Sequence, residues 1–402
     1  MRIPLVYTLR HLWNRRTATA IHLLVVVGVV TMLTLVLSLA RGLDHTLVDA
    51  GDPRVLVVKS KRARAEAASA IPLTALGPLA SLPHLARHPD GTPVMSPECT
   101  GYVAVLPRGR QGAERTNIAV RGLEWRQVRR MIPGIRIVNG RLFEQGRREL
   151  IVGRAASRWF EGLAPRDRVM IGSGIGDRFE IVGVFAISGQ DGDTGSVRES
   201  ELWGDYVMIM DSYRRPFLNS VRLRVADDAG PQDVQSIMET IATGSDVDAR
   251  REPEVFGEYS RHAREIRFAA AVLGVLMGAG AVFAIANTLF AAASGRLREI
   301  GVLRAIGFSS TAVLAAFLVE ALLLSGTGGI LGCLLAAQFN GIQKALLSQT
   351  SMTAVVYEMR VTPALLAGSF LLSLLLGALG GLAPAVRAAR MHVVDAIRGI
   401  PW

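Results

Sequence analysis

The sequence predicts a membrane protein with four transmembrane helices and a large mixed α/β domain inserted between helices 1 and 2. Half of the 402 residues are hydrophobic, a share that is high for a soluble protein. Four apolar runs each hold about 20 residues or more, enough at about 1.5 Å per residue to cross a hydrocarbon core about 30 Å thick. The four runs are 21–40, 268–293, 312–337 and 363–386. The polar stretch between the first two runs accounts for the inserted domain.

The first apolar run resembles a signal peptide in that it follows a basic segment and ends near a small-residue site. Its apolar part is too long for such a peptide, so we expect a retained transmembrane helix. Before it, within Ile3–Arg16, apolar residues recur at helical spacing opposite Arg10 and Arg15. This spacing predicts a short helix on the inner membrane surface. Residues 1–41 are therefore expected to form a surface helix followed by transmembrane helix 1.

Basic residues in the short connections predict the orientation in the membrane. Ten arginines lie in the N-terminal segment, in the connection after the second run and at the C-terminus, whereas the connection between the third and fourth runs holds only Lys344 and Arg360. The positive-inside rule then places both termini in the cytoplasm. We therefore expect a multi-pass membrane protein with residues 42–266 outside the cytoplasm.

The charge distribution argues against a nucleic-acid partner, although the formal net charge is +11. The region 41–267 holds 33 of the 45 basic residues and 30 of the 34 acidic residues, a net charge of only +3. The basic surplus lies instead at the predicted inner membrane face, where it favours the orientation and contacts with anionic lipid. We expect membrane lipids, and no nucleic acid, among the partners.

The inserted region alternates short strand and helix patterns, with glycine-rich turns in its middle. The predicted strands are 54–59, 95–106, 117–121, 149–153, 167–171, 178–187 and 221–225, and the predicted helices are 74–85, 124–131 and 231–242. The β-rich middle predicts an inserted lobe at about 139–206. Residues 189–200 are polar and rich in glycine, which predicts a mobile loop.

The connection between the second and third runs carries the most specific pattern. Arg296–Gly307 reads RLREIGVLRAIG, and the following run contains FLVEALLL at Phe317–Leu324. A helix over about 294–308 would place leucine and isoleucine on one stripe, and glycine and alanine beside it would leave room for another surface. From the residues alone, a docking helix for a partner and a basic loop held by lipid headgroups are equally supported.

These two segments resemble the permease family that includes macrolide exporters, lipoprotein-releasing permeases and the cell-division FtsX proteins. The resemblance spans about 287–332. It implies FtsX-like transmembrane helices 2–4 over 267–402, a two-lobed extracytoplasmic domain and a coupling helix that binds a separate cytoplasmic ABC ATPase. It also implies that the protein lies in the bacterial inner (cytoplasmic) membrane. The residues expected to contact that ATPase are Arg296, Arg298, Glu299, Gly301, Arg304, Ala305 and Gly307.

The resemblance implies a permease subunit that couples ATP hydrolysis by its partner to movement of the extracytoplasmic domain, for export or extraction of a small molecule, lipid or lipoprotein. The alternative is a non-transporting mechanotransmission subunit that regulates an outer enzyme such as a cell-wall hydrolase. A second permease chain, in a homodimer or heterodimer, and a periplasmic adaptor are further expected partners. A receptor or scaffold without an ATPase would leave the docking pattern unexplained.

No enzymatic activity is expected of this chain. The sequence contains no G-x-x-x-x-G-K-[ST] phosphate-binding motif and no cysteine and histidine spacing typical of a metal site. We therefore expect no catalytic residue, metal or cofactor here, and ATP and Mg bound by the partner ATPase.

Two kinds of residue inside the apolar runs indicate how the helices pack. Glu320 is a carboxylate within the third run, where a charge is costly unless it is paired or protonated. We expect it either to lie at a coupling interface near Asn287 or the inner-face arginines, or to fix helix packing as a protonated or hydrogen-bonded group. Glycine pairs spaced G-x-x-x-G allow close approach of helices within the chain, or at a dimer seam. They are Gly274 and Gly278, Gly328 and Gly332, and Gly377 and Gly381.

Overall fold

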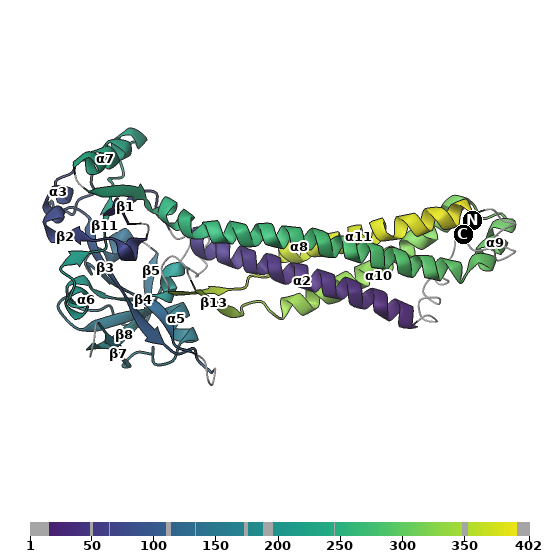
Figure 1. Ribbon diagram of the computed structural model, residues 1–402, viewed down its shortest axis with the longest axis horizontal. Coiled ribbons are helices and arrows are strands. Elements are labelled where there is room, and N and C mark those ends of the chain that lie inside the picture. The colour runs from purple at the N-terminus through teal and green to yellow at the C-terminus, as the bar shows by residue number, and fades with distance from the viewer. Residues whose placement is uncertain are drawn as a thin grey trace. The chain divides into compact units, whose positions relative to one another are not determined.

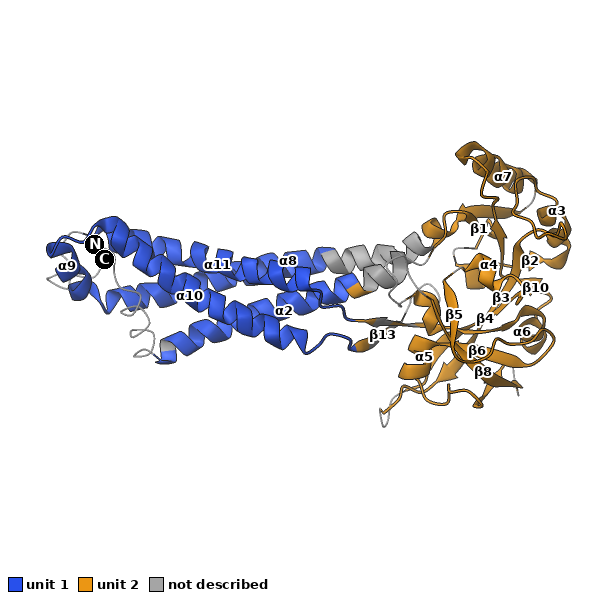
Figure 2. Cartoon of the chain, turned by 180° about the vertical axis from the view of Figure 1, so that it is seen from behind, with its two compact units in different colours: residues 1–41, 264–342, 359–402 blue, residues 42–263, 343–358 orange. Residues whose placement is uncertain are grey.

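Four long helices and one broad mixed sheet make up most of the chain (Figure 1). The computed structural model describes residues 16–48, 51–63, 65–109, 114–132, 134–172, 176–187, 196–244, 246–347 and 353–391. Residues 1–41, 264–342 and 359–402 form a helical unit, and residues 42–263 and 343–358 form an α/β unit (Figure 2). The predicted surface helix within 3–16 lies almost wholly outside the described residues.

The four predicted transmembrane helices are confirmed as long apolar helices. Each contains a segment of 24 to 28 residues that is long and apolar enough to cross a membrane. They are α2 (Arg16–Val48), α8 (Glu252–Ser294), α10 (Ser310–Ala337) and α11 (Pro363–Arg390). α8 is longer than its apolar run because it begins in the α/β unit and continues as one helix into the helical unit.

The six glycines of the G-x-x-x-G pairs each face another helix of the same chain. A Cβ atom added at any of them would come within 3.4 Å of a neighbouring side chain. At Gly274 and Gly278 the facing atom is the end of a flexible leucine side chain. At the other four positions a Cβ of the facing helix would lie under 3.0 Å away, so glycine is what lets the helices approach there. The facing pairs are Gly274 with Leu33, Gly278 with Leu376, Gly328 with Val26, Gly332 with Val30, Gly377 with Ser325 and Gly381 with Ala321. Packing within the chain therefore accounts for their positions.

Replacing Gly377 with alanine is expected to destabilise the helical unit by about 1–3 kcal/mol, because the pair α10–α11 would be overpacked. The new Cβ would lie 2.5 Å from the Cβ of Ser325. Gly368→Ala on the same helix is the matched control, since nothing lies within 4 Å of its Cβ position. Thermal unfolding of both variants in the same detergent measures the difference, and equal midpoints would contradict this account of the packing.

A ten-stranded mixed sheet organises the α/β unit, counted over the described residues. Its order is β12-β1-β11-β3-β4-β9-β6-β8-β5, and β7 also pairs with β8. The strands are β1 (Val55–Ser60), β3 (Met95–Val105), β4 (Thr116–Leu123), β5 (Ile135–Gly140), β6 (Glu149–Gly153), β7 (Arg168–Ile171), β8 (Asp177–Ile187), β9 (Leu202–Asp205), β11 (Ser220–Arg224) and β12 (Val247–Arg251). Every predicted strand is present, whereas β5, β9 and β12 were not predicted.

The sheet is continuous across the two predicted lobes. β4 pairs in parallel with β9, which joins the strands of the middle region to those from both ends of the insert. One apolar core contains Leu56, Leu223 and Ile237, and a second contains Ile118, Leu150 and Phe179. The predicted lobe at 139–206 therefore shares one sheet, and the second core, with strands from outside it.

Short helices cover this sheet. They are α3 (Leu76–Ala80), α4 (Val128–Met131), α5 (Arg154–Trp159), α6 (Tyr206–Ser212) and α7 (Pro231–Gly244), with 3-10 turns η1 (Glu66–Ala68), η2 (Leu73–Ala75) and η3 (Val197–Ser200). The predicted helix over 74–85 is too long, because only α3 and the preceding turn are helical. Most of the predicted mobile loop over 189–200 lies outside the described residues. The prediction is wrong at its end, where η3 carries buried Arg198 and Glu199.

The connection between α10 and α11 forms a β-hairpin that belongs to the α/β unit. Its strands, β13 (Gln343–Leu347) and β14 (Ala354–Glu358), pair antiparallel. A separate two-stranded sheet, β2 (Ile71–Pro72) and β10 (Phe217–Leu218), lies elsewhere in the unit. Ala354 and Val356 are buried in the core around Leu150. The sequence predicted only a loop here, within the region 267–402 assigned to the membrane part.

Candidate coupling site

A short helix, α9 (Leu297–Ala305), connects α8 to α10 within the predicted coupling segment 294–308 (Figure 1). Gly307 follows it with a φ of +103°, a conformation that glycine adopts without strain and that ends helices. The Ser309 side chain then accepts a hydrogen bond from the amide of Ala312 at 3.2 Å and caps α10. These two residues fix both ends of the turn between α9 and α10.

One face of α9 is packed into the helical unit. Leu297 and Ile300 are buried, and Ile300 belongs to an apolar cluster with Phe317 of α10 and Ala388 of α11. Gly301 is also on the buried side. The stripe of apolar residues predicted from helical spacing therefore holds α9 against the ends of its neighbours.

Arg304 fastens α9 to the C-terminal end of α11. Its guanidinium donates to the carbonyl oxygens of Ala389 at 3.1 Å and Met391 at 2.5 Å, and to the hydroxyl of Ser310 at 3.3 Å. The last carbonyls of a helix have no partner within the helix, so an arginine here satisfies them and complements the negative end of the helix dipole. Arg304 is half-buried as a result.

A buried ion pair fastens the other end of α9. Arg296, just before the helix, lies 3.4 Å from a carboxylate oxygen of Glu320 on α10, and both residues are buried. This pairing explains how an acid is accommodated within the third apolar run. The expectation that Glu320 lies near an inner-face arginine agrees with this geometry, whereas Asn287 is exposed on α8.

The opposite face of α9 is exposed. Arg298, Glu299 and Ala305 lie on it, and two apolar side chains beside them, Val302 and Ile306, are 50% and 65% exposed. Of the residues predicted to contact an ATPase, the structure thus places Arg298, Glu299, Ala305 and Gly307 at the surface, Arg296 and Gly301 inside, and Arg304 between the two. Their contact with an ATPase stays a prediction.

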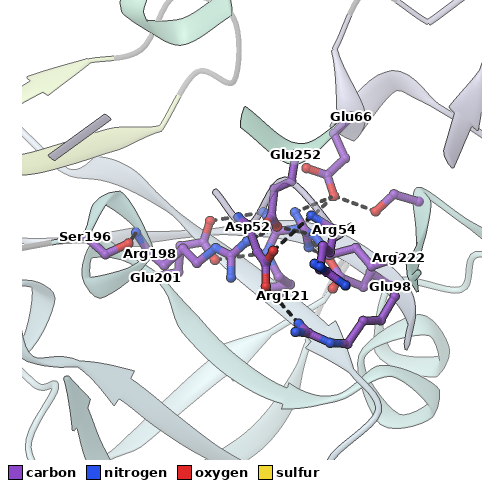
Figure 3. A network of polar contacts seen from close by, with 12 residues as sticks. Asp52, Arg54, Glu66, Glu98, Arg121, Ser196, Arg198, Glu201, Arg222 and Glu252 are labelled. Atoms are coloured by element: carbon purple, nitrogen blue, oxygen red, sulfur yellow. Dashed lines mark hydrogen bonds and ion pairs between the residues drawn. The ribbon is translucent and has the colours of Figure 1, made fainter. Parts of the chain in front are cut away.

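A second polar cluster, which the sequence did not predict, lies inside the α/β unit (Figure 3). Its charged members are Glu66, Glu98, Arg121, Arg198, Glu201, Arg222 and Glu252, and their side chains are no more than 14% exposed. They come from η1, β3, β4, η3, the residue after η3, β11 and the first turn of α8. We call this set the buried charge network.

Arg121 is the centre of one half of the network. It donates to Glu66 at 2.7 Å and to Glu98 at 2.8 Å, and it binds both oxygens of Glu201 at 2.9 and 3.1 Å. Arg222 binds Glu98 and Glu252 in the other half, and Arg198 also binds Glu252. Sharing of partners compensates charges that would otherwise be costly to bury.

The arginines outweigh the effect of burial on two glutamates. Burial alone would raise the pKa of Glu66, but Arg121 and Arg222 hold that pKa far below its usual range. Burial would likewise raise the pKa of Glu201, and Arg121 lowers it instead. Both carboxylates are therefore ionised in the folded state.

Acid is expected to destabilise the α/β unit through these groups. A folded-state pKa below the unfolded value gives stability that is present above about pH 4.3, the ordinary glutamate pKa, and is lost as the pH falls below it. The unfolding midpoint should therefore drop between about pH 5 and pH 3. Glu66→Gln should show a smaller drop over that range, because the titrating group is gone. An equally steep drop in this variant would contradict the assignment to Glu66.

The four apolar helices and the α/β unit together define a multi-pass membrane protein with an inserted α/β domain. Residues 19–241 match the MacB-like periplasmic core domain, and residues 271–393 match the FtsX-like permease C-terminal domain. The first match alone covers more than half of the chain. The protein belongs to the MacB/FtsX-type permeases of ABC transporters. This family implies a cytoplasmic ATPase partner, and the four apolar helices with a periplasmic domain indicate an inner membrane protein.

Individual relatives agree with this assignment. The chain is 27% identical over 222 residues to the macrolide export ATP-binding/permease protein MacB of Bradyrhizobium diazoefficiens, covering 54% of this chain and 33% of that protein. It is 37% identical over 129 residues to MacB of Nitrobacter winogradskyi, covering 32% and 18%. It is 24% identical over 307 residues to the uncharacterized ABC transporter permease YknZ of Bacillus subtilis, covering 72% of each. The chain thus spans a third or less of the MacB proteins it matches.

Two solved domains show a weaker likeness. The periplasmic region of MacB from Actinobacillus actinomycetemcomitans aligns with a TM-score of 0.37 at 13% identity, covering 55% of this chain and 97% of that one. The extracellular domain of YknZ aligns with a TM-score of 0.33 at 12% identity, covering 49% and 100%.

Proposed function

We propose that this permease couples ATP hydrolysis by a separate cytoplasmic ATPase to movement of its extracytoplasmic α/β domain. The ATPase binds ATP and Mg. It contacts this chain at α9. Both termini and α9 face the cytoplasm in this proposal. The work performed is export or extraction of a small molecule, lipid or lipoprotein, and the macrolide export named for the MacB relatives favours the small molecule among these.

The observation that carries this proposal is the division of α9 into a fastened face and an exposed face. Arg304 and Arg296 tie its two ends to α11 and α10, so a force on α9 reaches both helices. Val302 and Ile306 are exposed on a segment outside the four apolar helices, beside Arg298 and Glu299. Exposed apolar side chains among charged ones are typical of a protein interface.

Further partners follow from surfaces that the chain leaves uncovered. Phe268, Val275 and Phe283 on α8 and Leu371 on α11 are each more than 60% exposed, as expected of helices that face lipid or a second permease chain. Arg387 and Arg390, exposed at the end of α11, suit anionic lipid headgroups. A dimer and a periplasmic adaptor complete the proposed assembly.

Site-specific crosslinking in native membranes tests the proposal. A photoreactive amino acid at Ile306 is expected to capture an ABC ATPase subunit, because that side chain lies on the exposed face of α9. The same probe at Val207, which is 43% exposed on α6 of the α/β unit, is the control and should capture no ATPase. Adducts at Ile306 with lipid alone would refute the proposed docking role and support a basic segment held by headgroups.

A further inference from the structure

Two segments that lead from the helical unit make side-chain contacts inside the α/β unit. One is the first turn of α8, and the other is the β13–β14 hairpin between α10 and α11. Each is continuous in sequence with transmembrane helices, so each can carry a displacement of those helices into the α/β unit. Their contacts within that unit converge on the four-residue turn η3.

The α8 contact is a buried charge cluster at Glu252, the first residue of the helix. Its carboxylate accepts from the Nε of Arg222 at 3.0 Å, from Arg198 of η3, and from the backbone amide of Asp52 at 2.9 Å. Glu252 is 1% exposed. Because buried charges are costly to separate, the start of α8 cannot move without taking these partners with it.

The hairpin contact is a pair of hydrogen bonds between Ser200 of η3 and the backbone of Val356 on β14. The hydroxyl of Ser200 accepts from the amide of Val356 at 2.9 Å and donates to its carbonyl at 3.4 Å. Ser200 and Val356 are both 3% exposed. The hairpin is therefore fixed to η3 as well as packed in the core.

Between these two contacts, η3 is fastened to the sheet. Glu199 accepts a hydrogen bond from the amide of Ile187, the last residue of β8, at 2.8 Å, and lies 3.4 Å from Arg154 of α5. Arg198, Glu199 and Ser200 thus bind α8, the sheet and the hairpin in that order along the chain. No sequence motif marks this turn, which lies at the end of a polar glycine-rich stretch.

A small cavity lies at the same place. It has a volume of about 60 Å³, and its lining includes Ser200, Val255 of α8 and Thr353 of the hairpin. The hydroxyl of Thr100, which also lines it, is buried and has no hydrogen-bond partner among the described residues. Such a cavity has room for water, which would satisfy Thr100.

We propose that η3 is the junction at which movements of α8 and of the α10–α11 hairpin are combined and passed to the sheet. Arg198 and Ser200 are positioning residues that hold the two moving segments to one turn, and Glu199 passes their displacement to β8. This inference rests on the proposed function, because it needs an ATPase acting on α9. Beyond that function, the inference names η3 as the place where the motion of the transmembrane helices enters the α/β unit.

Hydrogen exchange on the permease–ATPase complex in nanodiscs tests this junction. The measured quantity is the change in deuterium uptake between the nucleotide-free and ATP–vanadate states, followed separately in α9 and in β6, β8 and β9. Arg198→Gln/Ser200→Ala is expected to reduce the change in those strands at least about twofold while the change in α9 persists. Ser200→Ala alone, which leaves the charge network intact, should act in the same direction and decides the matter if the double variant does not fold.

The matched control is Arg141→Gln/Ser212→Ala. Arg141 also binds a glutamate, Glu149, at 2.6 and 2.7 Å, and Ser212 is a buried serine with two hydrogen bonds. None of these hydrogen bonds goes to α8 or the hairpin. A full strand response in the η3 variants, or an equal loss in the control, would overturn the junction. Absence of any nucleotide response in wild-type α9 would instead refute the proposed function itself.

Discussion

Glu299→Arg combined with Val302→Asp is expected to abolish stable association with the ATPase. Both side chains lie on the exposed face of α9, so the substitutions reverse a charge and place another in the centre of the proposed interface. Losing contacts at an interface centre commonly costs about 2–4 kcal/mol, which lowers affinity by a factor of at least about 30. Co-purification from native membranes and the ATPase rate of the recovered complex measure the loss.

The fold should survive this double substitution, because exposed positions rarely contribute more than about 0.5 kcal/mol to stability. Glu239→Arg/Val207→Asp makes the same changes at exposed positions of α7 and α6 and should leave the complex intact. Recovery of the ATPase in normal amount with the α9 variant would exclude this face as the docking surface. Unfolding of the variant would show instead that the face is covered within the chain.

Arg304 is expected to behave differently from its neighbours on α9. The sequence placed it with the ATPase contacts because it is a basic residue in a specific pattern. In the structure its donors are directed at the carbonyls of Ala389 and Met391, so its removal should loosen α9 from α11. Loss of coupling in an Arg304 variant would therefore report on transmission through α11 as well as on any direct contact.

Local patterns sufficed for the elements whose signal is contained in consecutive residues. The four apolar runs and strands such as β1 and β8 follow from hydrophobic length and alternation, which depend little on the rest of the fold. The glycine and serine that end α9 and begin α10 could also be recognised, since capping is a property of neighbouring residues. These features define the permease architecture and the position of α9.

Long-range pairing is what the sequence could not supply. The sequence narrowed the partner of Glu320 only to Asn287 or an inner-face arginine, and the structure shows Arg296, 24 positions away. Glu252 pairs with Arg198 across 54 positions, and no pattern links these two residues. The β14 strand was missed because it has few apolar residues. It also lies between two transmembrane helices, where a loop is the usual connection. The available signal for a buried ion pair was a charged residue inside a predicted apolar or strand segment. Arg121, in a predicted strand, is such a residue.

Arg121→Met is expected to destabilise the α/β unit by about 3–5 kcal/mol, because three buried glutamates would lose their shared partner. Urea unfolding of the full-length protein, followed by tryptophan fluorescence, to which buried Trp203 contributes, measures this loss. The matched control is Arg141→Met. Arg141 also binds a glutamate through two hydrogen bonds but is 47% exposed, so its loss should cost no more than about 1 kcal/mol.

A second substitution separates charge imbalance from lost packing at Arg121. Glu201 is the glutamate that Arg121 binds through both oxygens, and Trp203 still donates to it at 2.8 Å when the arginine is gone. Arg121→Met/Glu201→Gln removes one stranded charge and retains an acceptor for Trp203, so it should recover part of the stability lost in the single variant. If the double variant is less stable than Arg121→Met, the loss comes from the methionine side chain and its fit rather than from unpaired charge. Equal costs for Arg121→Met and Arg141→Met would mean that burial does not set the strength of these ion pairs.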